Sequence, residues 1–251
     1  MKKLFALLLC AAMLCASLSA LAEAPAYATV EAGKLTISTS PDFPPFEYTD
    51  DQDNIIGIEP DLLALICEKI GLEPNWVPMD FDAALVAPQT GKTDIVVSGV
   101  TVREDRKAMF DFTHTYVSIH QAILVKEGSE INQDNLGNYL IGVQAGTTGH
   151  IYASEDFGED HVAAYDKYGM AVAALTNGQV DCILLDDMVA QAYAKRVPGL
   201  VVLPTSYEQE DFAFGLAKGH EDLLEAINSA LDELIANGTV EEIIVKYQTA
   251  E

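Results

Sequence analysis

Basic residues are scarce in this sequence. Its 251 residues include 14 lysines and arginines against 39 aspartates and glutamates, which gives a formal net charge of −25. So acidic a surface repels nucleic acids and anionic membranes, and we expect neither as a partner. A polyanionic ligand is disfavoured for the same reason, whereas a zwitterion with no net charge feels little repulsion. Acidity is also a common means of keeping a protein soluble, and this explanation stays open.

Long apolar runs are lacking too, apart from one at the start of the sequence. Lys2 and Lys3 precede an apolar stretch at residues 4–14, and Ala-Leu-Ala at 20–22 has the small-x-small pattern of a cleavage site. These features predict a secretory signal peptide over residues 1–22, because the apolar stretch is too short for a membrane-spanning helix. The mature chain loses two lysines and so carries a net charge of −27. We expect it to act in the periplasm, outside the cell or at the cell surface.

Cysteine is rare, and metal ligands are not clustered. Cys67 and Cys182 are the two cysteines beyond the expected signal peptide, and both lie in apolar patterns typical of core residues. The five histidines are scattered, and the sequence has no HExxH, no GxSxG and no complete phosphate-binding loop. We therefore expect no metal site, no cofactor and no catalytic residues.

The order of expected elements predicts an α/β fold with two similar halves. Strands alternate with helices in each half, which implies mostly parallel sheets flanked by helices and two lobes with a ligand cleft between them. Residues 33–120 with 212–251 form the first lobe and residues 121–211 the second. The chain crosses between the lobes near 120–125 and 204–212, where a hinge is expected. The expected strands are 34–39, 75–77, 94–97, 139–143, 180–185 and 200–203, and the expected helices are 60–70, 81–87, 170–175, 222–236 and one that Thr239 and Glu242 open as a capping box.

Residues 94–112 contain features of a binding site for a small carboxylate. A short apolar strand leads into Ser98, Gly99 and Thr101, whose small side chains leave room for a ligand beside backbone N–H groups and a hydroxyl. Arg106 follows, and its planar guanidinium donates two parallel hydrogen bonds to a carboxylate. A second interpretation is a solvated salt bridge from Arg106 to Glu104 or Asp111, since charge-rich turns are common. The pattern alone leaves both interpretations open.

An acidic pair, Asp186 and Asp187, follows a buried-looking strand in the second half. Neighbouring residues on a strand point to opposite faces, so at most one of the two carboxylates enters a cleft. A catalytic carboxylate pair is therefore not supported.

Together these features resemble the bacterial extracellular solute-binding proteins of family 3, the polar amino-acid receptors of ABC importers. The likeness extends over about residues 34–247. It implies a periplasmic-binding-protein-like fold of type II, with two α/β lobes and the ligand between them. Four segments carry the resemblance: TSPDFPPFEY at 39–48, GIEPDLLALICEKIG at 57–71, SGVTVREDRKAMFDFTHTY at 98–116 and IGVQAGTTG at 141–149.

The resemblance also implies which residues bind the ligand. One group binds the α-carboxylate of a free amino acid, one residue pairs with the α-ammonium, and two aromatic rings sandwich the side chain. For the two rings, a packed core role is the general alternative. The matching positions are Ser98, Gly99, Thr101, Arg106 and Thr148 for the carboxylate, Asp186 for the ammonium, Phe43 and Phe81 for the sandwich, and Gln144 for the tip of the side chain.

The implied function is amino-acid capture by closure of the lobes, followed by delivery to a membrane permease. We expect a monomer. Relatives that bind basic side chains often carry an acid at the position of Ser40, so serine there favours a neutral polar ligand.

Two other classes of function remain. A secreted dehydratase-like enzyme of the same fold would need an acid or base in the cleft, such as His120 or Glu59. A detached sensor module of a receptor is disfavoured by the lack of a second hydrophobic segment.

Overall fold

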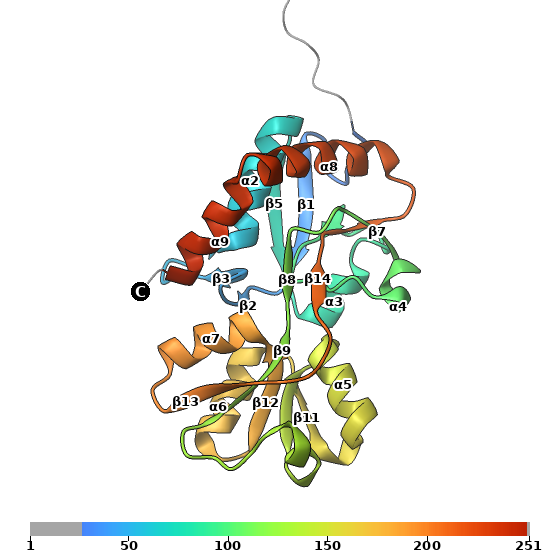
Figure 1. The fold of residues 1–251 in the computed structure, drawn as a ribbon. Helices are drawn as coiled ribbons and strands as arrows, with labels where there is room; N and C mark the ends of the chain where they lie inside the picture. The colour runs from blue at the N-terminus through green and yellow to red at the C-terminus, as the bar shows by residue number, and fades with distance from the viewer. Residues whose placement is uncertain (1–26, 250–251) are drawn as a thin grey trace, which may run out of the picture.

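The computed structural model describes residues 27–249 and shows two lobes joined by a narrow connection (Figure 1). The expected signal peptide lies outside these residues. Each lobe is built on a five-stranded sheet, so the predicted two-lobed α/β fold is confirmed. The first sheet, in the order β5-β1-β6-β15-β7, contains β1 (Lys34–Thr39), β5 (Glu73–Pro78), β6 (Ile95–Val96), β7 (Phe110–Phe112) and β15 (Gly215–Ala217); the second, in the order β11-β10-β12-β9-β13, contains β9 (Gln121–Lys126), β10 (Ile141–Gln144), β11 (Val162–Tyr165), β12 (Cys182–Asp186) and β13 (Leu200–Pro204).

Parallel pairing is limited to three strands of each sheet. In the first sheet β1 pairs in parallel with β5 and β6, and in the second β10 pairs in parallel with β11 and β12. The strands β15 and β9 pair antiparallel with both of their neighbours. Each of these two strands follows directly from the connection between the lobes, so its direction is set by the path of the chain rather than by a helical crossover. The sheets are therefore mixed.

The connection is a two-stranded ribbon of β8 (Val117–Ile119) and β14 (Glu210–Phe212), which pair antiparallel at the centre of the molecule (Figure 1). We expected the first crossing at 120–125. The structure places it earlier, because residues 121–126 form β9, an inner strand of the second sheet whose apolar side chains are buried. A smaller three-stranded sheet of β2 (Asp42–Phe43), β3 (Glu47–Thr49) and β4 (Ile55–Ile56) lies beside the first lobe's sheet.

Helices cover both faces of the second sheet. Successive side chains of β12 point to opposite faces and pack against different helices. Cys182 and Leu184 pack in one core with α5, whereas Ile183 and Leu185 pack in another with α6 and α7. Cys67 and Cys182 are both buried, and neither forms a disulfide, as expected of core residues. The helices are α2 (Ile58–Ile70), α3 (Phe81–Val86), α4 (Glu104–Lys107), α5 (Thr148–Phe157), α6 (Tyr168–Asn177), α7 (Asp187–Arg196), α8 (Glu221–Ala236) and α9 (Thr239–Thr249), with 3₁₀ turns η1 (Gln133–Asn138) and η2 (Glu159–His161).

Helices α2 and α9 do not begin as expected from the sequence. Helix α2 begins at Ile58 rather than near Pro60, and proline fits there because the N–H groups of the first turn have no intrahelical acceptor. At the other end of the sequence, the expected capping box of Thr239 and Glu242 is wrong. The N–H of Glu242 donates to the carbonyl of Gly238, so Thr239 already lies inside α9.

The first residues of α2 form hydrogen bonds with the segment that follows Phe43. The N–H groups of Ile58 and Glu59 donate to the carbonyls of Pro45 and Phe46, at 3.0 Å each. This close approach requires glycine at position 57, where φ is +139° and an added Cβ would lie 2.2 Å from the carbonyl oxygen of Phe46. None of the helices within residues 27–249 is long and apolar enough to cross a membrane.

We expect Gly57→Ala to destabilise the protein by about 3 kcal/mol or more, because the new Cβ overlaps backbone atoms as well as straining φ. The matched control is Gly91→Ala, where φ is +70° but nothing lies within 4 Å of the added carbon, so only about 1–2 kcal/mol is lost. Urea denaturation of the three proteins measures both values. Equal losses in the two variants would show that the contact with Phe46 does not constrain the loop.

Candidate functional site

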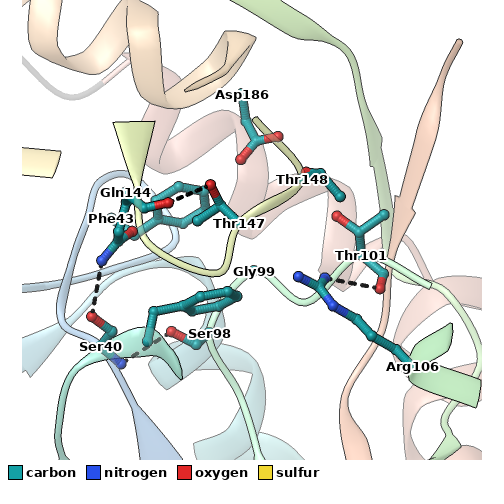
Figure 2. A pocket seen from close by; sticks show the side chains of 11 residues that line it. Ser40, Phe43, Ser98, Gly99, Thr101, Arg106, Gln144, Thr147, Thr148 and Asp186 are labelled. Atoms are coloured by element: carbon teal, nitrogen blue, oxygen red, sulfur yellow. Dashed lines mark hydrogen bonds between the residues drawn. The ribbon is translucent and has the colours of Figure 1, made fainter. Parts of the chain in front are cut away.

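Eleven residues line one cavity where loops of the two lobes meet (Figure 2). All nine residues singled out in the sequence are among them, and their binding role stays a prediction. Ser40 and Thr147 complete the lining, and sequence reasoning did not single out Thr147. The lining residues are Ser40, Phe43, Phe81, Ser98, Gly99, Thr101, Arg106, Gln144, Thr147, Thr148 and Asp186.

The strand directions explain why these residues meet. Ser40 follows β1 and the loop 98–101 follows β6, at the carboxyl ends of neighbouring parallel strands. In the other lobe, Gln144 ends β10 and Asp186 ends β12, which are also parallel neighbours. Carboxyl ends of parallel strands share one edge of a sheet, and here the two edges face each other across the cavity.

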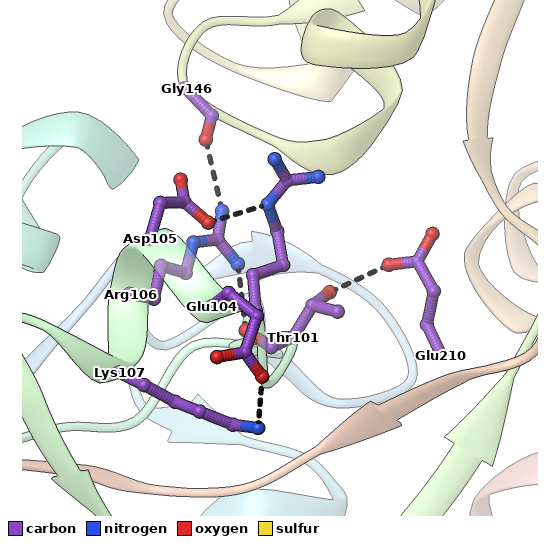
Figure 3. A network of polar contacts seen from close by, with 8 residues as sticks. Thr101, Glu104, Asp105, Arg106, Lys107, Gly146 and Glu210 are labelled. Atoms are coloured by element: carbon purple, nitrogen blue, oxygen red, sulfur yellow. Dashed lines mark hydrogen bonds and ion pairs between the residues drawn. The ribbon is translucent and has the colours of Figure 1, made fainter.

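Arg106 is buried in this cavity rather than paired on the surface. It is 4% exposed, and its Nη1 and Nη2 donate to the carbonyl oxygens of Thr101 and Gly146 at 3.2 and 3.1 Å (Figure 3). The alternative salt bridge is wrong, because Glu104 pairs with Lys107 and Asp111 with Lys218. Burial lowers the pKa of Arg106 to about 10, so the guanidinium keeps its charge at neutral pH.

The expected donors of the 98–101 loop point away from the cavity toward buried carboxylates. The hydroxyl of Ser98 donates to Glu47 at 2.8 Å, the N–H of Gly99 donates to Glu59 at 3.0 Å, and the hydroxyl of Thr101 donates to Glu210 at 2.8 Å. These three donors are engaged within the protein. A carboxylate in the cavity would therefore meet the guanidinium of Arg106 and the start of helix α5.

The start of α5 supplies further donors from the second lobe. Thr147 caps the helix, accepting from the N–H of His150 at 3.2 Å and donating to the carbonyl of Gln144 at 2.8 Å. Thr148 is the first helical residue, and N–H groups in a first turn have no intrahelical acceptor. Together with the partial positive charge of a helix start, they favour an anion at this position.

Asp186 lies in the same cavity as Arg106 with no cation paired to it among the described residues. Its side chain is 4% exposed and accepts from Nε2 of Gln121 at 2.6 Å. Burial, followed by the nearby charge of Glu210, raises the pKa of Asp186 well above the usual aspartate range. The neighbouring Asp187 begins α7 and does not line the cavity, as expected of one member of this pair.

Sequence reasoning missed Gln121, which contacts two of the cavity residues. Its Nε2 also donates to the hydroxyl of Thr148 at 3.2 Å, so one buried amide orients two cavity residues. The available signal was a polar residue opening the apolar strand β9. Gln121 is 1% exposed, and a buried polar side chain of this kind needs partners.

Two aromatic rings and two neutral polar groups form the remaining walls. Phe43 and Phe81 are each 5% exposed; Phe43 also stacks on Tyr168 across the lobes, with ring centroids 5.8 Å apart. At the far end, Nε2 of Gln144 donates to the carbonyl of Asp166 at 2.9 Å and lies 3.4 Å from the hydroxyl of Ser40 (Figure 2). The lining side chains at this end carry no charge, but the carboxylate of Asp42 lies behind them, 3.1 Å from the hydroxyl of Ser40 and 3.4 Å from Nε2 of Gln144.

The residues considered for an enzyme do not reach the cavity. His120 is exposed, and Glu59 is fully buried behind Gly99. Within residues 27–249 no group of three or more histidines, cysteines or acidic residues is arranged to bind a metal ion.

Comparison with known proteins identifies the family. Bacterial extracellular solute-binding proteins, family 3, match residues 35–250 of this chain. The chain belongs to this family. Among the relatives of this solute-binding protein, the arginine-binding extracellular protein ArtP of Bacillus subtilis is 30% identical over 257 residues, covering 100% of both chains. The L-cystine-binding protein TcyJ of Escherichia coli is 28% identical over 225 residues, covering 88% of this chain and 85% of TcyJ.

Solved structures agree with this assignment. An ancestral arginine-binding protein bound to glutamine superposes with a TM-score of 0.82 at 34% identity, covering 86% of this chain and 97% of that protein. The relatives of this solute-binding protein are receptors for small solutes, not enzymes.

Asp186→Asn should stabilise the ligand-free solute-binding protein, because asparagine keeps an acceptor for Gln121 without a buried charge. The folded-state pKa of Asp186 is raised above its unfolded value, so its charge costs nothing at low pH. The cost grows as the pH rises through the folded-state pKa. Melting temperatures of both proteins from acidic to neutral pH should therefore diverge in favour of the variant. A constant difference across this range would show that the carboxylate is not destabilised.

Proposed function

We propose that this chain is an extracytoplasmic receptor that captures one free α-amino acid between its lobes and delivers it to the permease of an ABC importer. One observation carries the proposal: the buried Arg106 and Asp186 face one enclosed cavity and neither has an ion-pair partner within the described residues. Buried opposite charges that are not paired with each other are costly. A zwitterion supplies the missing partner to each.

The parts of an α-amino acid fit the cavity in one orientation. Its carboxylate lies against Arg106 and the start of α5 at Thr148, and its ammonium lies against Asp186. Its side chain lies between Phe43 and Phe81. Ser98, Gly99 and Thr101 form the adjoining wall, and Gln144 and Ser40 meet the tip of the side chain.

A neutral polar amino acid is the ligand class that this cavity favours. Arg106 and Asp186 are the charged side chains in the lining, and both are used by the ligand's own carboxylate and ammonium. The side chain therefore meets uncharged lining groups, with the carboxylate of Asp42 behind Ser40 and Gln144. Relatives do not decide the matter, because those named above bind arginine or cystine, and one arginine-binding protein holds glutamine.

Contacts between the lobes support closure around the ligand. The hydroxyl of Tyr193 in α7 donates to the carbonyl of Asp42 at 2.8 Å, and Arg106 reaches Gly146 across the cavity. The lobes of this proposal are residues 33–120 with 212–251 and residues 121–211, and β8 and β14 form the hinge. The closed form is what the permease recognises. The receptor acts as a monomer in the periplasm or at the cell surface after removal of residues 1–22.

Arg106→Ala should weaken amino-acid binding by about 2–5 kcal/mol, because the ligand carboxylate loses its buried cation. Arg106→Lys keeps the charge but not the two-pronged geometry. Its affinity for the amino acid should therefore lie between those of Arg106→Ala and the native protein. Isothermal titration measures all three. Lys107→Ala is the control, since it removes a solvent-facing cation from the same helix α4. Native affinity in Arg106→Ala would overturn the proposed site.

Titration against the twenty amino acids tests the ligand class. We expect a neutral polar amino acid to bind more tightly than arginine, lysine, histidine, aspartate or glutamate. A thermal-shift screen gives the ranking first, since a ligand at 100 times its Kd stabilises the folded state by about 2.7 kcal/mol. Tightest binding of a charged amino acid would refute the ligand class alone, and failure of all twenty would refute the receptor itself.

A further inference from the structure

Two glutamates lie in contact beneath the loop 98–101. Glu47 in β3 and Glu59 in α2 are both 0% exposed, and their carboxyl groups are hydrogen-bond partners of each other. Neither lines the cavity, and neither has a role in the binding site proposed above. Two carboxyl groups retained side by side in the interior require a physical account, because buried charges of the same sign repel each other.

Each glutamate binds one residue of the loop. Oε1 of Glu47 accepts from the hydroxyl of Ser98 at 2.8 Å, and that hydroxyl accepts from the N–H of Ser40 at 3.0 Å. Oε1 of Glu59 accepts from the N–H of Gly99 at 3.0 Å and from the hydroxyl of Tyr116. The pair therefore determines the orientation of two neighbouring cavity residues.

The contact between the two carboxyl groups requires one proton. Oε2 of each glutamate is buried and has no donor among the other described residues. If both groups were ionised, two like charges would be buried in contact, with no donor to either Oε2 atom. One proton shared between the two carboxyl groups removes the repulsion and halves the buried charge.

The surroundings of the pair favour the same state. Asp42 faces it from β2 and Tyr116 from the segment before β8. Within residues 27–249 neither glutamate forms an ion pair with a lysine, arginine or histidine. Burial raises the pKa of both carboxyl groups, and the charge of Glu59 raises the pKa of Glu47 further.

The two positions are not equivalent. Oε1 of Glu59 accepts two hydrogen bonds from the protein, whereas Oε1 of Glu47 accepts one. Donors to a carboxylate favour its ionised form, so the charge resides on Glu59 and the proton on Glu47. The protonated carboxyl group of Glu47 then donates to Glu59.

We propose that Glu47 and Glu59 are positioning residues of the amino-acid site, a carboxylic acid and a carboxylate sharing one proton, which together fix Ser98 and Gly99 for ligand binding. With its proton donated to Glu47, the hydroxyl of Ser98 offers a ligand only an acceptor. Loss of the shared proton would place two charges beneath the loop and move both residues. The role in ligand binding rests on the proposed function, whereas the shared proton does not.

Isosteric variants distinguish the two glutamates. Glu47→Gln keeps a donor toward Glu59 and an acceptor for Ser98, so its Kd for L-glutamine should stay within about threefold of the native value. Glu59→Gln moves the charge to the position with fewer donors or leaves two donors facing each other, and should weaken binding about tenfold or more. Glu68→Gln, on an exposed position of the same helix α2, is the control and should change neither binding nor stability.

The proton is observed directly in the ligand-free protein. The infrared difference spectrum of native protein minus Glu47→Gln at neutral pH should show the C=O stretch of a carboxylic acid, and the difference for Glu68→Gln should show only a carboxylate. Since the folded-state pKa of Glu47 is raised, the native protein should lose stability relative to Glu47→Gln as the pH rises from the unfolded-state pKa of this glutamate to its folded-state pKa. Hydrogen exchange of the Gly99 amide should accelerate in Glu59→Gln.

The outcomes separate this inference from the proposed function. An infrared signal of a carboxylate at Glu47 would overturn the shared proton, whether or not an amino acid binds. Equal effects of Glu47→Gln and Glu59→Gln on stability and on hydrogen exchange of the Gly99 amide would overturn it too. If Glu59→Gln fails to fold, the infrared difference for Glu47→Gln still decides it. Failure of every amino acid to bind, with the acid signal present, would refute the receptor and leave the proton-sharing pair established.

Discussion

The structure depends on two buried charges that the protein itself leaves without ion pairs. Among the described residues, Arg106 donates hydrogen bonds only to carbonyl oxygens and lies over the ring of Phe81, and Asp186 accepts a hydrogen bond only from the amide of Gln121. An internal ion pair between them would satisfy both charges and remove the incentive to bind a zwitterion. In the proposed receptor, the ligand neutralises both charges. The empty closed form is disfavoured under this proposal, so ligand binding and closure of the lobes would be thermodynamically linked.

Much of this site could be predicted from the sequence because its residues lie in short local patterns. A strand followed by small residues and an arginine indicates where Ser98 and Arg106 lie, since a parallel strand ends at the functional edge of its sheet. The same logic applies to Asp186 at the end of β12. Phe43 is different: the prolines and the acid beside it predict a loop, whereas the structure places it at the end of the short strand β2.

The remaining features depend on contacts between distant residues. The donors of Ser98, Gly99 and Thr101 bind glutamates that are 51, 40 and 109 residues away, so no local pattern shows that they point away from the cavity. The same limit applies to the antiparallel strands β9 and β15, whose direction follows from the path of the connecting ribbon. The cap of α9 was misjudged because Thr239 and Glu242 have the spacing of a capping box, whereas Gly238 accepts the hydrogen bond that ends the first turn.

Three buried glutamates from three different elements anchor the wall between the cavity and the connection of the lobes. Glu47 in β3 and Glu59 in α2 fix the first part of the loop, and Glu210 in β14 fixes Thr101. Because β14 belongs to the connecting ribbon, the third anchor joins the loop to the segment proposed above as the hinge. Thr101 in turn accepts a hydrogen bond from Arg106 through its carbonyl oxygen. The position of the guanidinium is therefore coupled to the ribbon through two hydrogen bonds. The first two anchors belong to the first lobe and keep Ser98 and Gly99 fixed. Bending of the ribbon would therefore act on Thr101 and Arg106, where the ligand carboxylate is proposed to bind, rather than on the whole loop.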